Sequence, residues 1–170
     1  GPKPGAGKPF PAPVPERRGE GKTILGPFER MSSALQNNQN GSDPPPLDPE
    51  IRDAIYRAVA SEPLACELNM KLLELERGYS CVEMRYDPET MANIYNRAHG
   101  GAIFSLIHEA FETASQTGGT IAVALNVNVT YVQSPAEPMR LLARAGETSR
   151  TRKTASYDIR VTDENQQLIA

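Results

Sequence analysis

The longest periodic stretch of the chain lies in its middle, where apolar residues recur at the three- and four-residue spacing of an α-helix. One stripe contains Ile103, Ile107, Ala110 and Ala114. Three further apolar residues widen it, namely Phe104, Leu106 and Phe111. An apolar surface this wide is typical of a helix that other structure surrounds. The pattern therefore predicts one long buried helix that begins near residue 100.

Elsewhere the apolar residues alternate with polar ones, which is the period of a half-buried strand. Strands are expected at residues 70–76, 80–86, 121–131, 139–147, 155–162 and 167–170. The last of these is short, so either the sequence is truncated there or the sheet ends abruptly. Ahead of the strands, Asp48-Pro49-Glu50 supplies the cap, the first-turn proline and the early acidic residue of a helix that Pro63 ends.

This order of elements predicts an α+β fold in which a curved antiparallel sheet wraps around the central helix. Most of the 15 prolines precede residue 50 and are accompanied by Gly, Asn and Ser. A segment of that composition cannot bury enough apolar surface to offset the entropy lost on ordering it. We therefore expect a leader over residues 1–47, disordered or tag-derived in part, and a folded domain over residues 48–170.

Composition narrows the class of partner. The net charge is −3 and the chain contains no Trp, so a nucleic acid is not expected. Cys66 and Cys81 lack the spacing of metal ligands, and we expect two reduced thiols and no metal. No apolar run approaches the roughly 20 residues that span a bilayer. We accordingly expect no membrane partner and a cytoplasmic location.

The start of the predicted helix carries the first chemical signal. Gly100 and Gly101 leave backbone N–H groups uncovered at the end where the helix dipole favours negative charge. An oxyanion or a polarised carbonyl oxygen requires donors of this kind.

The sequence from Asn93 through His99-Gly100-Gly101 resembles the hot-dog-fold acyl-CoA thioesterases, in particular the PaaI-like branch. The resemblance also rests on residues 124–131 with Ser134-Pro135, and on the closing segments at residues 152–154, 157–161 and 167–170. It covers roughly residues 49 to 170.

This resemblance implies that the Gly100 N–H binds the thioester carbonyl and that Asn93 lies beside the reacting group. Asn93 could instead serve a local hydrogen bond to the loop backbone. His99 is expected to hold the loop in place. The family works as a homodimer with the site between protomers, often paired again into a homotetramer. Coenzyme A is then part of the substrate, and no other cofactor is expected.

One position departs from the family. The residue nine positions after the motif His is usually Asp or Glu, and here it is His108. Glu109 follows, but one residue rotates a side chain by about 100° around a helix, away from the site. Glu112 lies on the same face as His108, so we expect His108 to act as the general base and Glu112 to orient it. The alternative is a structural pair in a protein that has lost hydrolysis.

A second departure is Ala124, which stands where some relatives place a catalytic Ser. A third feature is cationic. The densest basic cluster of the folded part contains Arg150, Arg152 and Lys153. Basic residues on such strands meet the phosphates of coenzyme A in the family, although surface charges are usually just solvated.

Two functions follow from these residues. The first is hydrolysis of an acyl-CoA thioester to the free acid and CoA, with Gly100 as the oxyanion donor. The second is a non-hydrolytic acyl-CoA-binding protein, a ligand sensor or a scaffold, in which the usual carboxylate has been lost. Hydrolysis is the function we expect.

Overall fold

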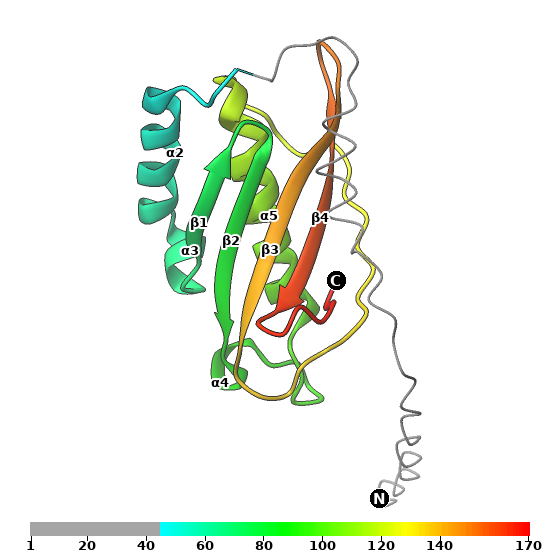
Figure 1. Ribbon diagram of the computed structural model, residues 1–170. Coiled ribbons are helices and arrows are strands. Elements are labelled where there is room, and N and C mark those ends of the chain that lie inside the picture. Colours follow the sequence, from blue (N-terminus) through cyan, green and yellow to red (C-terminus); the bar gives the residue numbers. More distant parts are fainter. Residues whose placement is uncertain (1–44) are drawn as a thin grey trace, which may run out of the picture. The chain divides into compact units, whose positions relative to one another are not determined.

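A long helix packs against one antiparallel sheet in the computed structural model, which describes residues 45–170 (Figure 1). The helix is α5 (Gly100–Ser115), and the sheet has four strands in the order β1-β2-β3-β4. The predicted fold class, an antiparallel sheet around one central helix, is confirmed. Nearly all of the leader expected over residues 1–47 lies outside the described residues.

Each strand pairs with its neighbour in the chain, and all pairs are antiparallel. The strands are β1 (Lys71–Glu76), β2 (Tyr79–Tyr86), β3 (Met139–Arg150) and β4 (Ala155–Asp163). These bounds confirm four of the predicted strands. Gly78, in the β1–β2 turn, has a φ of 71°, which side-chain-bearing residues rarely adopt.

The first helix ahead of α5 begins where the sequence predicted. In α2 (Pro49–Ser61) the side chain of Asp48 accepts a hydrogen bond from the Glu50 N–H at 2.8 Å, which caps the first turn. A proline is tolerated in the first turn of a helix but not in its interior. Pro63 therefore follows the end of α2 and starts a second, shorter helix, α3 (Pro63–Glu67). Two further short elements, α4 (Pro88–Met91) and the 3₁₀ helix η1 (Gln116–Gly118), flank α5.

The core lies between α5 and the sheet. Ile103, Leu106, Ala110 and Ala114 are buried on the inner side of the helix, as the periodicity predicted. Leu106 is fully buried, and such a side chain stabilises the fold by about 1.5–3 kcal/mol. Residues of β2, β3 and β4 belong to the same cluster, including Val82, Met84, Leu141, Ala143 and Val161. This packing fixes the direction in which α5 presents its other faces.

The prediction of a strand over residues 121–131 is wrong for this chain. This segment runs outside the sheet, and no backbone hydrogen bond joins it to another described residue. Ile121 and Leu125 are about nine-tenths exposed, at 90% and 89%. The segment has the alternating period of a strand, but a strand also needs a neighbouring strand for its backbone hydrogen bonds, and none of the described residues supplies one.

Residues 167–170 do not form a full strand. The predicted strand over residues 167–170 is reduced to one bridge, between Thr162 and Leu168. The Ile169 carbonyl also accepts the N–H groups of Val132 and Gln133 at 2.9 and 3.2 Å. Among the described residues, no helix has the length and apolar character needed to cross a lipid bilayer.

Candidate functional site at helix α5

The N-terminus of α5 is capped by the histidine of the His-Gly-Gly motif. Nδ1 of His99 accepts a hydrogen bond from the Gly101 N–H at 2.8 Å. The His99 N–H itself bonds to the Met91 carbonyl at 2.8 Å. These two bonds tie the loop to the helix, which agrees with the expectation that His99 holds the loop. They also mean that the Gly101 N–H is already engaged.

Gly100 therefore carries the open donor. The hydrogen bonds of the described residues include none from its N–H group. Its carbonyl accepts the Tyr131 hydroxyl at 3.0 Å, and a Cβ at this position would lie 3.3 Å from the Tyr131 ring. The two open amides that the sequence indicated are thus reduced to one, at the positive end of the helix dipole.

Asn93 has a local structural role. Its Oδ1 accepts the backbone N–H groups of Tyr95 and Arg97 at 2.9 and 3.2 Å. Its own backbone N–H donates to the Arg97 carbonyl at 2.7 Å. These bonds form the tight turn that leads to α5, as in the alternative interpretation of Asn93. A role beside the reacting group stays a prediction, and for that role only the side-chain nitrogen is open.

His108 lies eight residues beyond Gly100, in the middle of α5. Its ring stacks on Phe104 at a centroid distance of 6.1 Å and lies against Phe111 at 5.9 Å. Nδ1 of His108 is buried and has no hydrogen-bond partner, so the expected bond to Glu112 is not formed there. The paired role of His108 and Glu112 stays a prediction.

Glu109 is the functional candidate that sequence reasoning dismissed. Glu109 and His108 line the same cavity of about 170 Å³. Its carboxyl group is buried, with an exposed fraction of 4%, and Oε1 has no hydrogen-bond partner. Burial, together with the charge of Glu62 and a hydrogen bond to it and the charge of Glu112, raises the pKa of Glu109 to about 8. No pattern in the sequence connects Glu109 with Glu62, which lies 47 residues earlier.

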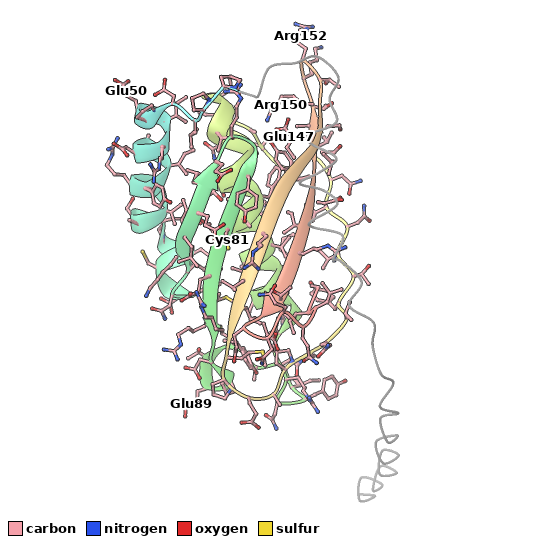
Figure 2. All side chains as sticks on the ribbon, in the orientation of Figure 1. Glu50, Cys81, Glu89, Glu147, Arg150 and Arg152 are labelled. Atoms are coloured by element: carbon pink, nitrogen blue, oxygen red, sulfur yellow. The ribbon has the colours of Figure 1, made fainter. Side chains whose placement is uncertain are left out.

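The basic cluster is divided in the structure. Arg150 forms a two-pronged pair with Glu147, with its Nη2 2.6 Å from Oε2, and also donates to the Tyr157 hydroxyl at 2.8 Å. The hydrogen bonds from Arg150 and Tyr157 hold the pKa of Glu147 below its usual value, although burial opposes this. Arg152 and Lys153 lie exposed in the turn between β3 and β4, where Figure 2 labels Arg152 at the tip.

This turn and the open amide of Gly100 lie at opposite ends of the domain. Thr117, just beyond the end of α5, accepts the Gly78 N–H at 2.8 Å, and the Gly78 carbonyl accepts the Glu147 N–H at 2.8 Å. The β3–β4 turn therefore lies beyond the C-terminal end of α5 (Figure 1). Within one chain, the structure does not bring Arg152 and Lys153 to Gly100. Ala124, the other departure, is exposed on the segment outside the sheet.

Comparison with known proteins places the chain in a family. Residues 95–170 match the family model described as the thioesterase superfamily. A relative from Archaeoglobus fulgidus, whose name assigns it provisionally as an esterase, is 37% identical over 120 residues, or 71% of this chain and 75% of the relative. The acyl-coenzyme A thioesterase PaaI of Escherichia coli is 27% identical over 103 residues, or 61% of this chain and 73% of the relative.

Solved structures agree. The E. coli PaaI structure superposes with a TM-score of 0.68 at 24% identity, over 72% of this chain and 88% of that one, which confirms the predicted hot-dog fold. A Streptococcus mutans protein, solved bound to acetyl CoA, gives a TM-score of 0.56 at 28% identity, over 59% of this chain and 81% of that one. The chain belongs to the thioesterase superfamily.

Proposed function

We propose that this protein hydrolyses an acyl-coenzyme A thioester to the free acid and CoA. The observation that carries the proposal is the Gly100 N–H at the start of α5, which forms no hydrogen bond with a described residue in a chain of this superfamily. The name of the E. coli relative and the acetyl CoA bound to the S. mutans neighbour favour a CoA ester as the substrate.

The distance along α5 sets a condition on this chemistry. His108 lies eight residues after Gly100, which is about 12 Å along a helix that rises 1.5 Å per residue. A carbonyl oxygen bound at about 3 Å from the Gly100 nitrogen is therefore out of reach of the His108 ring in the same chain. We infer that the site combines Gly100 of one protomer with His108 of a second copy, in a homodimer that can pair again into a tetramer.

The proposed mechanism then needs a base, a water molecule and an oxyanion donor. His108 takes a proton from water, the resulting hydroxide attacks the thioester carbonyl carbon, and the Gly100 N–H stabilises the tetrahedral oxyanion. When the carbon–sulfur bond breaks, the imidazolium returns its proton to the CoA thiolate. Glu112 orients the ring, and a Glu112–His108 contact would have to form when substrate and the second copy are in place.

The phosphates of CoA are the proposed ligands of Arg152 and Lys153. Both side chains are exposed and neither forms an ion pair with a described residue, so both are open to an anion. Arg150 was expected to join them, but its guanidinium is held by Glu147. In the dimer, we propose that the β3–β4 turn of one protomer serves the thioester site of the other.

The alternative is an acyl-CoA-binding protein without hydrolysis. One observation favours it, because Nδ1 of His108 has no hydrogen-bond partner and no carboxylate fixes the ring among the described residues. Both functions need the same binding surface, so affinity alone does not separate them.

A thiol-release assay over a panel of acyl-CoA esters, combined with calorimetric titration of the same esters, separates the two. Hydrolysis predicts stoichiometric release of CoA thiol with multiple turnovers, and the Gly100→Pro variant should be much slower. Binding of esters with no release of thiol would refute the hydrolase and support the alternative. Sedimentation velocity on the same sample tests the homodimer.

A further inference from the structure

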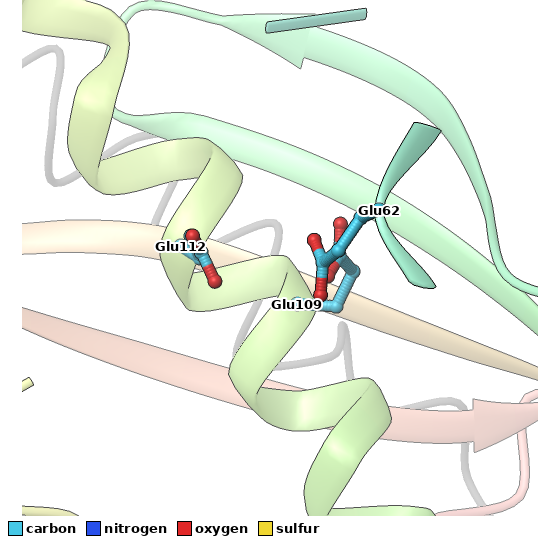
Figure 3. Close-up of side chains that lie close together, drawn as sticks. All are labelled: Glu62, Glu109 and Glu112. Carbon is cyan, nitrogen blue, oxygen red and sulfur yellow. The ribbon is translucent and has the colours of Figure 1, made fainter. Parts of the chain in front are cut away.

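Three carboxylates from distant parts of the sequence meet beside the central helix. Glu62 lies at the junction of α2 and α3, and Glu109 and Glu112 lie three residues apart on α5. Each offers an oxygen atom, and these oxygens all lie within 4.8 Å of one another. Figure 3 shows the side chain of Glu62 directed at Glu109, with Glu112 on the next turn of the helix.

Within residues 45–170, no positively charged side chain forms an ion pair with this cluster. Neither ion pair of the described residues includes Glu62, Glu109 or Glu112. Glu109 is 96% buried, and no described residue forms a hydrogen bond with its Oε1. Burying an ionised carboxylate without a partner is costly, so buried charges in proteins are normally paired or bound to a metal. The described part of the chain therefore leaves the cluster without a compensating charge.

A proton satisfies only part of this demand. Glu109 lines the cavity that adjoins the cluster, and a proton on its carboxyl group would serve only one of the cluster's oxygens. Among the residues that line the adjoining cavity, the other titratable groups are Glu62 and His108. One shared proton neutralises one of the three carboxylates. A divalent cation neutralises the charge of two, and the unpaired oxygen of Glu109 can coordinate it.

We propose that Glu62, Glu109 and Glu112 bind one hard divalent cation of the class Ca²⁺, Mg²⁺ or Mn²⁺. All donors are carboxylate oxygens, which this class prefers, and no sulfur or imidazole belongs to the group. Metal–oxygen bonds of about 2.0–2.6 Å allow one ion to touch oxygens that are up to twice that distance apart. The 4.8 Å limit of the cluster meets this condition for Ca²⁺, whereas the shorter bonds of Mg²⁺ would require the carboxylate oxygens to move closer together.

The surroundings can complete the coordination shell. Three carboxylates supply between three and six oxygens, depending on how many bind through both, and ions of this class take six to eight. The adjoining cavity of about 170 Å³ is lined by Glu62 and Glu109. Since a water molecule occupies about 30 Å³, this cavity has room for the water ligands that remain. Such an ion ties the α2–α3 junction to α5 by bonds that the apo chain lacks.

Calorimetric titration of the full chain, stripped with EDTA and dialysed, tests the site. CaCl₂, MgCl₂ and MnCl₂ are titrated at pH 8.5 and at pH 5.5 into the wild type and into Glu62→Gln, Glu109→Gln and Glu112→Gln. Glu67→Gln is the matched control, because Glu67 is exposed on α3 and lies outside the cluster. Circular dichroism checks that each variant is folded.

The expected result is one saturable site per chain for at least one of these ions, with higher affinity at pH 8.5 than at pH 5.5 because protons compete with the ion for carboxylate oxygens. Each cluster variant should lose at least 10-fold in affinity, and Glu67→Gln should match the wild type. The absence of saturable binding to a folded wild-type chain at millimolar ion would overturn the proposal and leave a proton-sharing cluster. Undiminished binding by Glu109→Gln would also overturn it.

Discussion

The first turn of α5 and its middle turns differ in what carries the chemistry. At the first turn the candidate group is the Gly100 N–H, a backbone donor whose position follows from where the helix begins. In the middle turns the candidates are side chains, His108 and Glu109, which line a cavity together with Glu62 from outside the helix. A backbone donor tolerates sequence change around it, whereas a buried carboxyl group depends on every neighbour. The difference can be tested variant by variant.

Removing the backbone donor should have the largest effect. Gly100→Pro deletes the N–H at the first helical position, where a proline is otherwise well tolerated. Loss of one oxyanion donor lowers kcat by about 10²–10³. Steady-state hydrolysis of the best acyl-CoA ester measures the change. Gly100→Ala keeps the N–H and adds the same Cβ near Tyr131, so an equal loss in both variants would show that crowding, and not the missing donor, is responsible.

Removing the imidazole should cost somewhat less. His108→Ala is expected to lower kcat by roughly 10² or more if the ring is the general base. The pH profile is the sharper measurement, because the acidic limb of kcat should disappear with the base. His108→Gln preserves much of the volume between Phe104 and Phe111 and serves as the packing control. A kcat equal to that of the wild type would remove His108 from the mechanism.

The exposed hairpin turn should affect binding and leave the chemical step unchanged. Arg152→Ala is expected to raise KM about 10-fold for a CoA ester, which is the size of one lost charge-assisted contact. It should leave the hydrolysis of a short pantetheine ester unchanged, since that substrate has no nucleotide phosphates. Parallel kinetics with the two substrates separate these cases. Equal effects on both esters would contradict phosphate binding by Arg152.

Glu109 should alter the pH dependence of stability. The pKa of its carboxyl group rises from 4.5 to about 8 on folding, so the folded chain holds a proton that the unfolded chain releases between these values. The contribution of this carboxyl group to the free energy of unfolding is therefore fully present below about pH 4.5, and it is lost as the pH rises to about 8. In Glu109→Gln, the decrease in Tm between pH 5 and pH 8.5 should be smaller than in the wild type by several degrees. Thermal unfolding from pH 5 to pH 8.5 in EDTA measures it, and identical slopes in both proteins would refute a buried protonated Glu109.

The sequence predicted much of the fold because most of the relevant signals are local. The cap at Asp48, the break at Pro63 and the stripe along α5 each depend on neighbouring residues, and each is confirmed. The segment over residues 121–131 was misjudged because alternation reports a period and not a neighbouring strand. Pairing depends on contacts that are distant in the sequence.

The site divides in the same way. The open amide of Gly100 followed from two glycines at a helix start, although the capping bond from Gly101 to His99 reduced the number of donors. The proximity of Glu62 to Glu109 in the middle of α5 could not be predicted. Helical geometry gives the face of α5 on which Glu109 lies, but it does not give the residue from outside the helix that lies beside it. Arg150 pairs with Glu147, three residues earlier, and its proposed role at the CoA phosphates stays a prediction.

Complementation between two inactive variants tests most directly whether Gly100 and His108 act from different protomers. Gly100→Pro and His108→Ala chains are mixed, unfolded together and refolded, and thiol release is compared with that of each variant alone. The proposed site predicts recovery to about a quarter of wild-type activity, because random exchange places one intact site in half of the dimers. If the mixture is no more active than the separate variants while sedimentation shows mixed dimers, the two groups do not act across the interface, and the proposed site is wrong.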